Sequence, residues 1–455
     1  MIEHGLAAPP VAAYLRTTRG TGSEYLRYPT DKYIRFWGDF LESLELSDIS
    51  ASHIKLSIVD STNPDIETIK ISGRSHLIFD QAIIDVFAMM TSVSFHVSGP
   101  RLGITAADFG GRAWWVHALF ANRFMNDGRY PEAVVQGDLC ARAREMQGDL
   151  TIDESRRDRW VETQVAFSLA HEVGHCSVFN GAQVLARSGS ASFEEVMRPY
   201  VDLMDQEHPV DYQRAPESLV IERRAEEYLK EVNASLVEHG HDPLPHNPLP
   251  TYRGMSYGEK LDFILADESG VGEEVVADYL AMSMVARLMA YPEMPVDECL
   301  AACVAAVRTM FLLRAVEVIS NSYFNSRLPA NALADLLNEM RIREEFAGFS
   351  AMVLSRRQHL REIDEPDGIL SDAAKKALEL RSSRIAGFLS HMANRWSEDI
   401  FLPIPHEMHA GITFDAVARL GNDPQFQKMT KSPNLASVLA EITGIGRPQV
   451  NWPPR

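Results

Sequence analysis

Apolar residues recur with two different periods along this chain, which predicts a small sheet followed by many helices. Residues 53–59, 68–71 and 75–79 alternate apolar and polar positions or form short apolar runs, as β-strands do. From residue 81 onward the apolar positions recur every three to four residues, the period of an α-helix. Helices are predicted over 81–90, 112–126, 276–288, 296–319, 330–345 and 372–396, and between Asp153 and Gly181. The predicted fold class is therefore α+β, predominantly helical, with a small N-terminal β-sheet.

The same pattern divides the chain into regions. We predict an N-terminal extension (1–50), a core (51–325) and a helical C-terminal region (326–455). The last 55 residues gain prolines and glycines and lose the helical periodicity. Within them, the segment His406-Glu407-Met408-His409 follows Pro403 and Pro405 and is interpreted as a loop.

The composition narrows the range of partners. A formal net charge of −19 disfavours nucleic acid and anionic membranes, because both attract basic surfaces. Pro9-Pro10 interrupts the start of the chain, so no secretory signal is expected. No segment supplies about 20 uninterrupted apolar residues, so no membrane span is predicted and the expected location is cytoplasmic. The four cysteines (Cys140, Cys176, Cys299 and Cys303) form no disulfide framework and are not interpreted as ligands.

The strongest candidate chemistry is the pentapeptide His171-Glu172-Val173-Gly174-His175. Residues four apart lie one above the other on a helix, so both imidazoles can bind one ion. Glu172 lies beside that ion, where it can take a proton from a bound water. This is the pattern of zinc peptidases. Helical context supports it: Asp153 or Ser155 can cap the helix, and an apolar stripe recurs at Val161, Val165, Leu169 and Val173.

Gly174 is an unusual residue for a helix interior, where it costs about 1 kcal/mol relative to alanine. A close approach by another element would explain it. Ala277, on a later predicted helix, is small enough for such a contact with Gly174. We therefore expect the two helices to meet at these residues.

A catalytic zinc site needs a third protein ligand and leaves its fourth position to water. Glu274 is the best candidate, because Asp278 lies four residues later on the same helix face. That aspartate can accept the outer N–H of a zinc-bound histidine. Glu194 and Glu195 are the alternative, nineteen and twenty residues after His175, but neither has an aspartate one turn later.

HEVGH followed by Glu274-x-x-Ala277-Asp278 on a later helix resembles the gluzincin metallopeptidases, particularly the M48-like group and its soluble relatives. The resemblance implies a zincin-like core and one zinc ion per chain, held by His171, His175 and Glu274. It implies that Glu172 is the general base and acid, and that Asp278 is the partner of a ligand histidine, His171. In order of elements the likeness covers about residues 50 to 320.

Two further expectations follow from the resemblance. Ninety-eight residues separate His175 from Glu274, longer than the family's compact spacing, so residues 181–270 are interpreted as an insertion or lid. The strand at 75–80 is expected at an edge of the sheet, where it would pair with an extended substrate; an ordinary interior strand is the alternative.

The expected activity is that of a zinc-dependent endopeptidase acting on a protein or peptide substrate. The residue that would stabilise the oxyanion stays open among Tyr252, Tyr257, Tyr279, His208 and His246. One alternative is a non-catalytic zinc module with a fourth protein ligand. The other is a di-iron carboxylate protein, for which Glu172-x-x-His175 would need a second half-motif; only Glu238-x-x-His241 is available.

Overall fold

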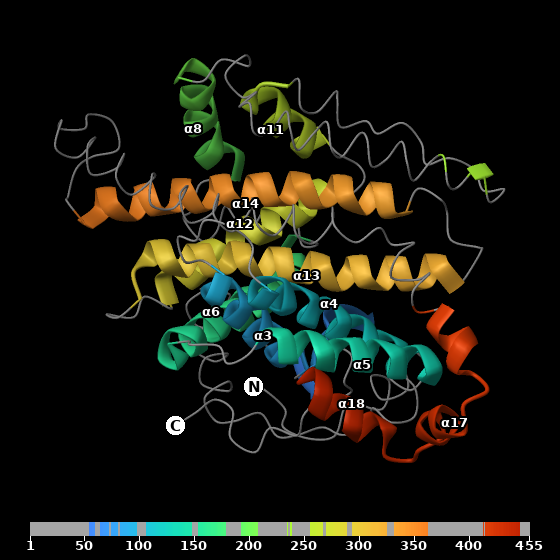
Figure 1. The fold of residues 1–455 in the computed structure, drawn as a ribbon. Helices are drawn as coiled ribbons and strands as arrows, with labels where there is room; N and C mark the ends of the chain where they lie inside the picture. Colours follow the sequence, from blue (N-terminus) through green and yellow to red (C-terminus); the bar gives the residue numbers. More distant parts are fainter. Residues whose placement is uncertain are drawn as a thin grey trace. The chain divides into compact units, whose positions relative to one another are not determined.

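The described part of the protein is predominantly helical and contains a small sheet, as the sequence predicts (Figure 1). The structure, a computed structural model, describes residues 54–59, 64–71, 74–80, 82–97, 106–147, 153–178, 193–207, 234, 237–238, 255–266, 270–288, 294–324, 332–362, 413 and 415–445. The chain forms two compact units. The first consists of Met1–Val173, Leu312–Phe324 and His406–Arg455, and the second of Gly174–Phe311 and Asn325–Pro405. The boundaries predicted at residues 50 and 325 lie outside the described residues.

The sheet of the first unit has three strands in the order β1-β3-β2 (β1, Ile54–Val59; β2, Ile66–Ile71; β3, Arg74–Asp80). β1 runs parallel to β3, and β2 runs antiparallel to it. All three predicted strands are confirmed, but the expectation that 75–80 is an edge strand is wrong. β3 pairs with β1 on one side and with β2 on the other, so neither of its edges is open to a further strand. Its residues Leu77, Ile78 and Phe79 are at most 2% exposed, so both of its faces are buried as well.

Three helices of the first unit follow the sheet: α3 (Ala82–Val97), α4 (Ala106–Asn126) and α5 (Tyr130–Gln147). α4 and α5 pack extensively against each other. The turn between them includes Gly128, whose φ of 71° favours glycine. The apolar residues on these helices form most of the described core of this unit.

The described part of the last 55 residues includes two short helices, α17 (Pro424–Thr430) and α18 (Leu435–Thr443), although the sequence has no long helical period there. Asp423 caps α17 by accepting from the main-chain N–H groups of Gln425 and Phe426. α18 packs against α4 and α5. Local capping and tertiary packing stabilise these helices, which are too short to produce a long apolar repeat in the sequence. The segment 406–409 and the helix predicted over 372–396 lie outside the described residues.

The second unit contains α8 (Phe193–Glu207), α11 (Tyr257–Ala266), α12 (Val271–Leu288) and α14 (Ala332–Glu362). α12 packs along α14, and α11 packs against α8 and α12. Asp205 of α8 accepts the first N–H groups of α11, those of Tyr257 and Gly258, at 2.7 and 2.8 Å. The described parts of the 181–270 segment are thus packed helices; its role as a lid stays a prediction.

Helix α13 (Val296–Phe324) contributes residues to both units. Its segment Val296–Val318 is long and apolar enough to cross a membrane by length and composition alone, but 83% of the relevant window is buried inside the protein. Arg308 interrupts the apolar run and forms an ion pair with Glu344 of α14. A buried core helix passes the same test of length and composition, so the segment is weak evidence for a membrane.

Candidate metal centre

Helix α6 (Glu154–Val178) carries the pentapeptide and begins where the sequence predicts. The main-chain N–H of Arg156 donates to Asp153 Oδ1 at 3.0 Å, as at a helix N-cap. A polar contact fixes the buried middle of the helix, because Thr91 of α3 donates to Gln164 Oε1 at 3.3 Å. The predicted apolar stripe is confirmed, since every member is at most 3% exposed: Val161, Val165, Leu169 and Val173. These contacts fix which face of α6 is buried, and therefore the directions in which His171 and His175 project from the helix.

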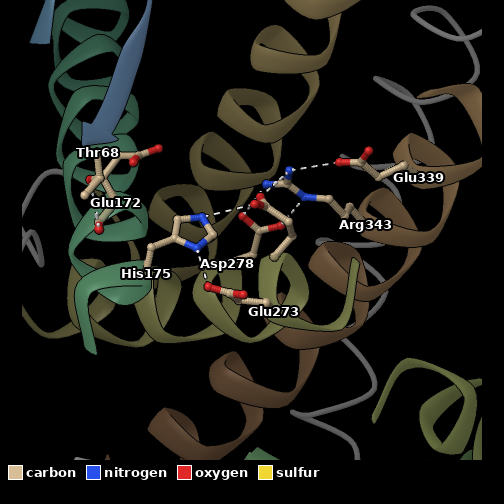
Figure 2. A network of polar contacts seen from close by, with 8 residues as sticks. Thr68, Glu172, His175, Glu273, Asp278, Glu339 and Arg343 are labelled. Atoms are coloured by element: carbon tan, nitrogen blue, oxygen red, sulfur yellow. Dashed lines mark hydrogen bonds and ion pairs between the residues drawn. The ribbon is translucent and has the colours of Figure 1, made fainter. Parts of the chain in front are cut away.

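His171, Glu172 and His175 bring their ligand atoms within 4.8 Å of one another on this helix. His171 is 3% exposed, whereas Glu172 and His175 are half-buried. The Thr68 hydroxyl of β2 donates to the main-chain oxygen of Glu172 at 3.4 Å, so the second strand lies beside this turn of α6 (Figure 2). Among the residues that the structure describes, this is the cluster of histidine and acidic side chains that could hold a metal ion.

Two carboxylates of α12 face the two ring nitrogens of His175. Glu273 Oε1 lies 3.2 Å from Nδ1, and Glu274 Oε1 lies 3.1 Å from Nε2. A neutral imidazole has one N–H and can donate to only one of them. The second nitrogen then presents its lone pair to a carboxylate oxygen, an arrangement that needs a cation, either a proton or a metal ion.

The spacing on the Nε2 side suits zinc. Tetrahedral ligands with bonds of about 2.0–2.2 Å lie about 3.3–3.4 Å apart, close to the observed separation of Nε2 and Glu274 Oε1. On the other side, Glu273 can accept the Nδ1–H and so fix the tautomer that leaves Nε2 for an ion. One cation would therefore fit between His175 and Glu274. Glu274 meets the group of His171, Glu172 and His175 through His175 and is not itself a member of that group.

Arg343 of α14 pairs with Oε2 of Glu274, the carboxylate oxygen that does not face His175 (Figure 2). Its Nη1 lies 2.6 Å from Glu274 Oε2, and its Nε and Nη2 each donate to Asp278 at 3.0 Å. Although burial lowers the pKa of Arg343, the charges of Asp278 and Glu274 raise it overall. Asp278, predicted as a partner of His171, is thus shown in a bidentate ion pair with Arg343.

The predicted contact between Gly174 and Ala277 is confirmed. A Cβ atom on Gly174 would lie 3.2 Å from both Cα and Cβ of Ala277, tighter than most real contacts. The absence of a side chain at Gly174 lets α12 approach the last turns of α6 closely. This approach is what brings Glu273 and Glu274 to His175.

The other candidates from the sequence lie elsewhere. Glu194 is exposed and pairs with Arg198 on α8, and Glu195 is also exposed on that helix. Glu238, from the second half-motif of the di-iron alternative, is exposed, and His241 lies outside the described residues. A further histidine, His117 of α4, packs against α5, with Nδ1 2.7 Å from Gln136 Oε1.

Two of the five oxyanion candidates are described, and both are tyrosines packed on other aromatic rings. Tyr257 stacks on Phe349, and burial raises its pKa to about 12. Tyr279 meets Phe193 edge to face, and burial raises its pKa as well. Tyr252, His208 and His246 lie outside the described residues. The oxyanion residue therefore stays open.

Sequence reasoning missed two residues of this centre, Glu273 and Arg343. Glu273 is adjacent to the predicted ligand, but only the rotation of α12 shows that it faces Nδ1 of His175. Arg343 belongs to a charged stretch of α14, typical of a solvent-facing helix, yet it is 7% exposed. No sequence signal distinguishes it from the other arginines of that helix.

The chain matches no protein-family model, no curated protein and no solved structure. A function is therefore inferred from the residues of the centre themselves.

Proposed function

We propose that this protein is a zinc-dependent endopeptidase of the gluzincin type, with a zincin-like core related to the M48-like group. The observation that carries the proposal is the position of His175 between two carboxylates, on the same helix as His171 and Glu172. His171, His175 and Glu274 would hold one zinc ion per chain. Substrates would be proteins or peptides.

A zinc ion held by these residues would act as a Lewis acid, which would acidify water and polarise a peptide carbonyl. Glu172, one position after His171, takes the proton of the attacking water and returns it to the leaving amine. Glu273 keeps the proton of His175 on Nδ1. Val173 and the rest of the buried stripe hold α6 in place. The side chains of His171, Glu172 and His175 on this helix therefore keep their relative positions.

β2 is the strand best placed to align a substrate, in place of β3. Among the described strands it lies at an edge of the sheet, and Thr68 joins it to the turn of α6 that carries Glu172. An extended peptide added to such an edge is held by main-chain hydrogen bonds, with little demand on its sequence. This mode of binding suits an endopeptidase with a broad range of substrates.

The variant Glu172→Gln tests the proposal, with Glu162→Gln on the same helix as its matched control. Zinc content is measured by elemental analysis, and hydrolysis is followed with a labelled unfolded protein and a mixture of peptides. We expect Glu172→Gln to keep its zinc and to lose at least about 10²-fold in turnover, the contribution of a general base. Retained hydrolysis would overturn the mechanism. Zinc without any hydrolysis by the unmodified protein would favour the non-catalytic zinc module.

A further inference from the structure

Three consecutive residues of α14 each form an ion pair with a different helix of the second unit. Arg343 pairs with Glu274 and Asp278 of α12, Glu344 pairs with Arg308 of α13, and Glu345 pairs with Lys260 of α11. The basic member of each pair is at most 7% exposed. Only the first of these pairs includes a candidate metal ligand.

The contacts of Arg343 divide the Glu274 carboxylate into two different oxygens. Oε2 lies 2.6 Å from Arg343, whereas Oε1 lies 3.1 Å from His175 Nε2. The guanidinium cannot rotate away, because Asp278 holds two of its nitrogens and its carbon lies 4.9 Å from the centre of the Phe311 ring. Oε1 is therefore the oxygen that is left for an ion.

We propose that Arg343 is a positioning residue of the metal centre: it holds Glu274 so that a single carboxylate oxygen faces the ion, and it thereby sets metal affinity and coordination number. This inference rests on the proposed function, because it takes Glu274 as a ligand. It goes beyond that proposal because the residue lies outside both sequence motifs. It also gives Asp278 a role, since that aspartate orients the guanidinium that orients the ligand.

Positive charge alone would not position Glu274; the planar shape of the guanidinium group is also needed. A variant that keeps the charge but loses this shape therefore tests the inference. Lysine keeps the positive charge but lacks the planar fork that binds Glu274 and Asp278 at the same time. Arg343→Lys should therefore free Oε2 of Glu274 from its contact with the guanidinium group while leaving the net charge of the centre unchanged. Arg308→Lys is the matched control: it makes the same change in an equally buried arginine that pairs with the next residue of α14.

The experiment measures Zn²⁺ affinity by competition with a chelator, and the visible spectrum of the Co²⁺-substituted protein, on the full chain. For Arg343→Lys we expect about 10- to 100-fold weaker Zn²⁺ binding, as for other residues that orient a ligand. Its Co²⁺ absorption should weaken as Glu274 becomes bidentate and the coordination number rises. Arg308→Lys should match the unmodified protein in both. Unchanged affinity and spectrum in Arg343→Lys would overturn the inference and leave the proposed function intact.

X-ray absorption by zinc in the unmodified protein keeps the inference testable even where Arg343→Lys does not fold. A single carboxylate oxygen at about 2.0–2.2 Å supports it, and a bidentate carboxylate overturns it. Absence of zinc binding by the unmodified protein overturns both proposals. Zinc binding without peptide hydrolysis ends the proposed function alone, because the affinity and spectra of Arg343→Lys still decide the role of this arginine.

Discussion

Gly174 and Ala277 meet so closely that a Cβ on the glycine would lie 3.2 Å from both Cα and Cβ of the alanine. The contact joins the last turns of α6 to α12, one residue before His175 and three residues after Glu274. Any side chain at Gly174 must push α12 away or be compressed. Since α12 carries the carboxylates that face His175, this contact sets the dimensions of the centre.

We expect Gly174→Ala to change the free energy of unfolding by less than about 1 kcal/mol. The gain in helix propensity, about 1 kcal/mol, offsets a modest overpacking cost. Gly174→Val should destabilise by about 1–3 kcal/mol, because its branched side chain adds volume at the backbone of Ala277. Chemical denaturation measures both. Ala277→Gly should recover part of the loss in Gly174→Val; strict additivity of the two changes would show that the contact is not responsible.

Glu273→Gln should weaken zinc binding by about 10-fold, because a neutral amide stabilises the Nδ1–H of His175 less well than a carboxylate does. The fold should persist, since Glu273 is only half-buried. Glu132→Gln is the control, because it also removes an acidic residue from the first turn of a helix and so changes the helix dipole interaction equally. Equal zinc affinities for the two variants would exclude a role of Glu273 in orienting His175.

Most of the helices and strands could be predicted because their signals are local. The stripe on α6 repeats every four residues, and a glycine in the middle of a helix predicted the contact with Ala277. The order of the strands could not be predicted, because it depends on pairing that alternation along one strand does not encode. The run of three apolar residues, Leu77, Ile78 and Phe79, indicated that both faces of β3 are buried, but not which strands pair with it.

Only the residues of the metal centre that belong to the two sequence motifs could be predicted. Two histidines four apart specify one helix face by geometry, whereas Arg343 meets Asp278 from a position 65 residues away. Its neighbours Glu344 and Glu345 are charged, which is typical of an exposed helix. Their burial results from partners on α11 and α13, and no spacing in the sequence indicates such partners.

Glu344→Ala should destabilise the protein by about 3 kcal/mol. The change leaves the Arg308 charge buried without its partner, which costs about 3–5 kcal/mol in a fully buried pair, and Glu344 keeps slight exposure. Arg314→Ala is the control: its pair with Glu317 is exposed, so its loss should cost less than about 1 kcal/mol. Urea denaturation compares the two. Similar losses for both variants would mean that Arg308 is hydrated in solution.

His117 should contribute to the loss of stability in acid. Burial lowers its pKa, and its hydrogen bond with Gln136 offsets only part of this effect. The unfolded chain, with a pKa of about 6.5, therefore binds the proton first. The contribution of neutral His117 to the free energy of unfolding is complete above that value. It is lost as the pH falls through the lower pKa of this histidine in the folded protein. Urea denaturation at pH 7.5 and 5.5 should show a smaller acid loss for His117→Gln than for the unmodified protein. An identical loss would contradict a buried, neutral imidazole.

Glu274 is expected to be the third ligand of the metal centre. Glu274 faces His175 Nε2 at 3.1 Å, whereas Glu194 and Glu195 are exposed on α8. We expect one zinc per chain in the unmodified protein and in the double variant Glu194→Ala/Glu195→Ala, and little or none in Glu274→Ala. The double variant removes two exposed charges and so controls for a general loss of negative charge. Elemental analysis after dialysis measures the zinc. Loss in the double variant alone would transfer the ligand to α8 and remove the need for a long insertion between the two motifs. Loss in Glu274→Ala alone would establish α12 as the source of the third ligand, and with it the need for the close contact at Gly174.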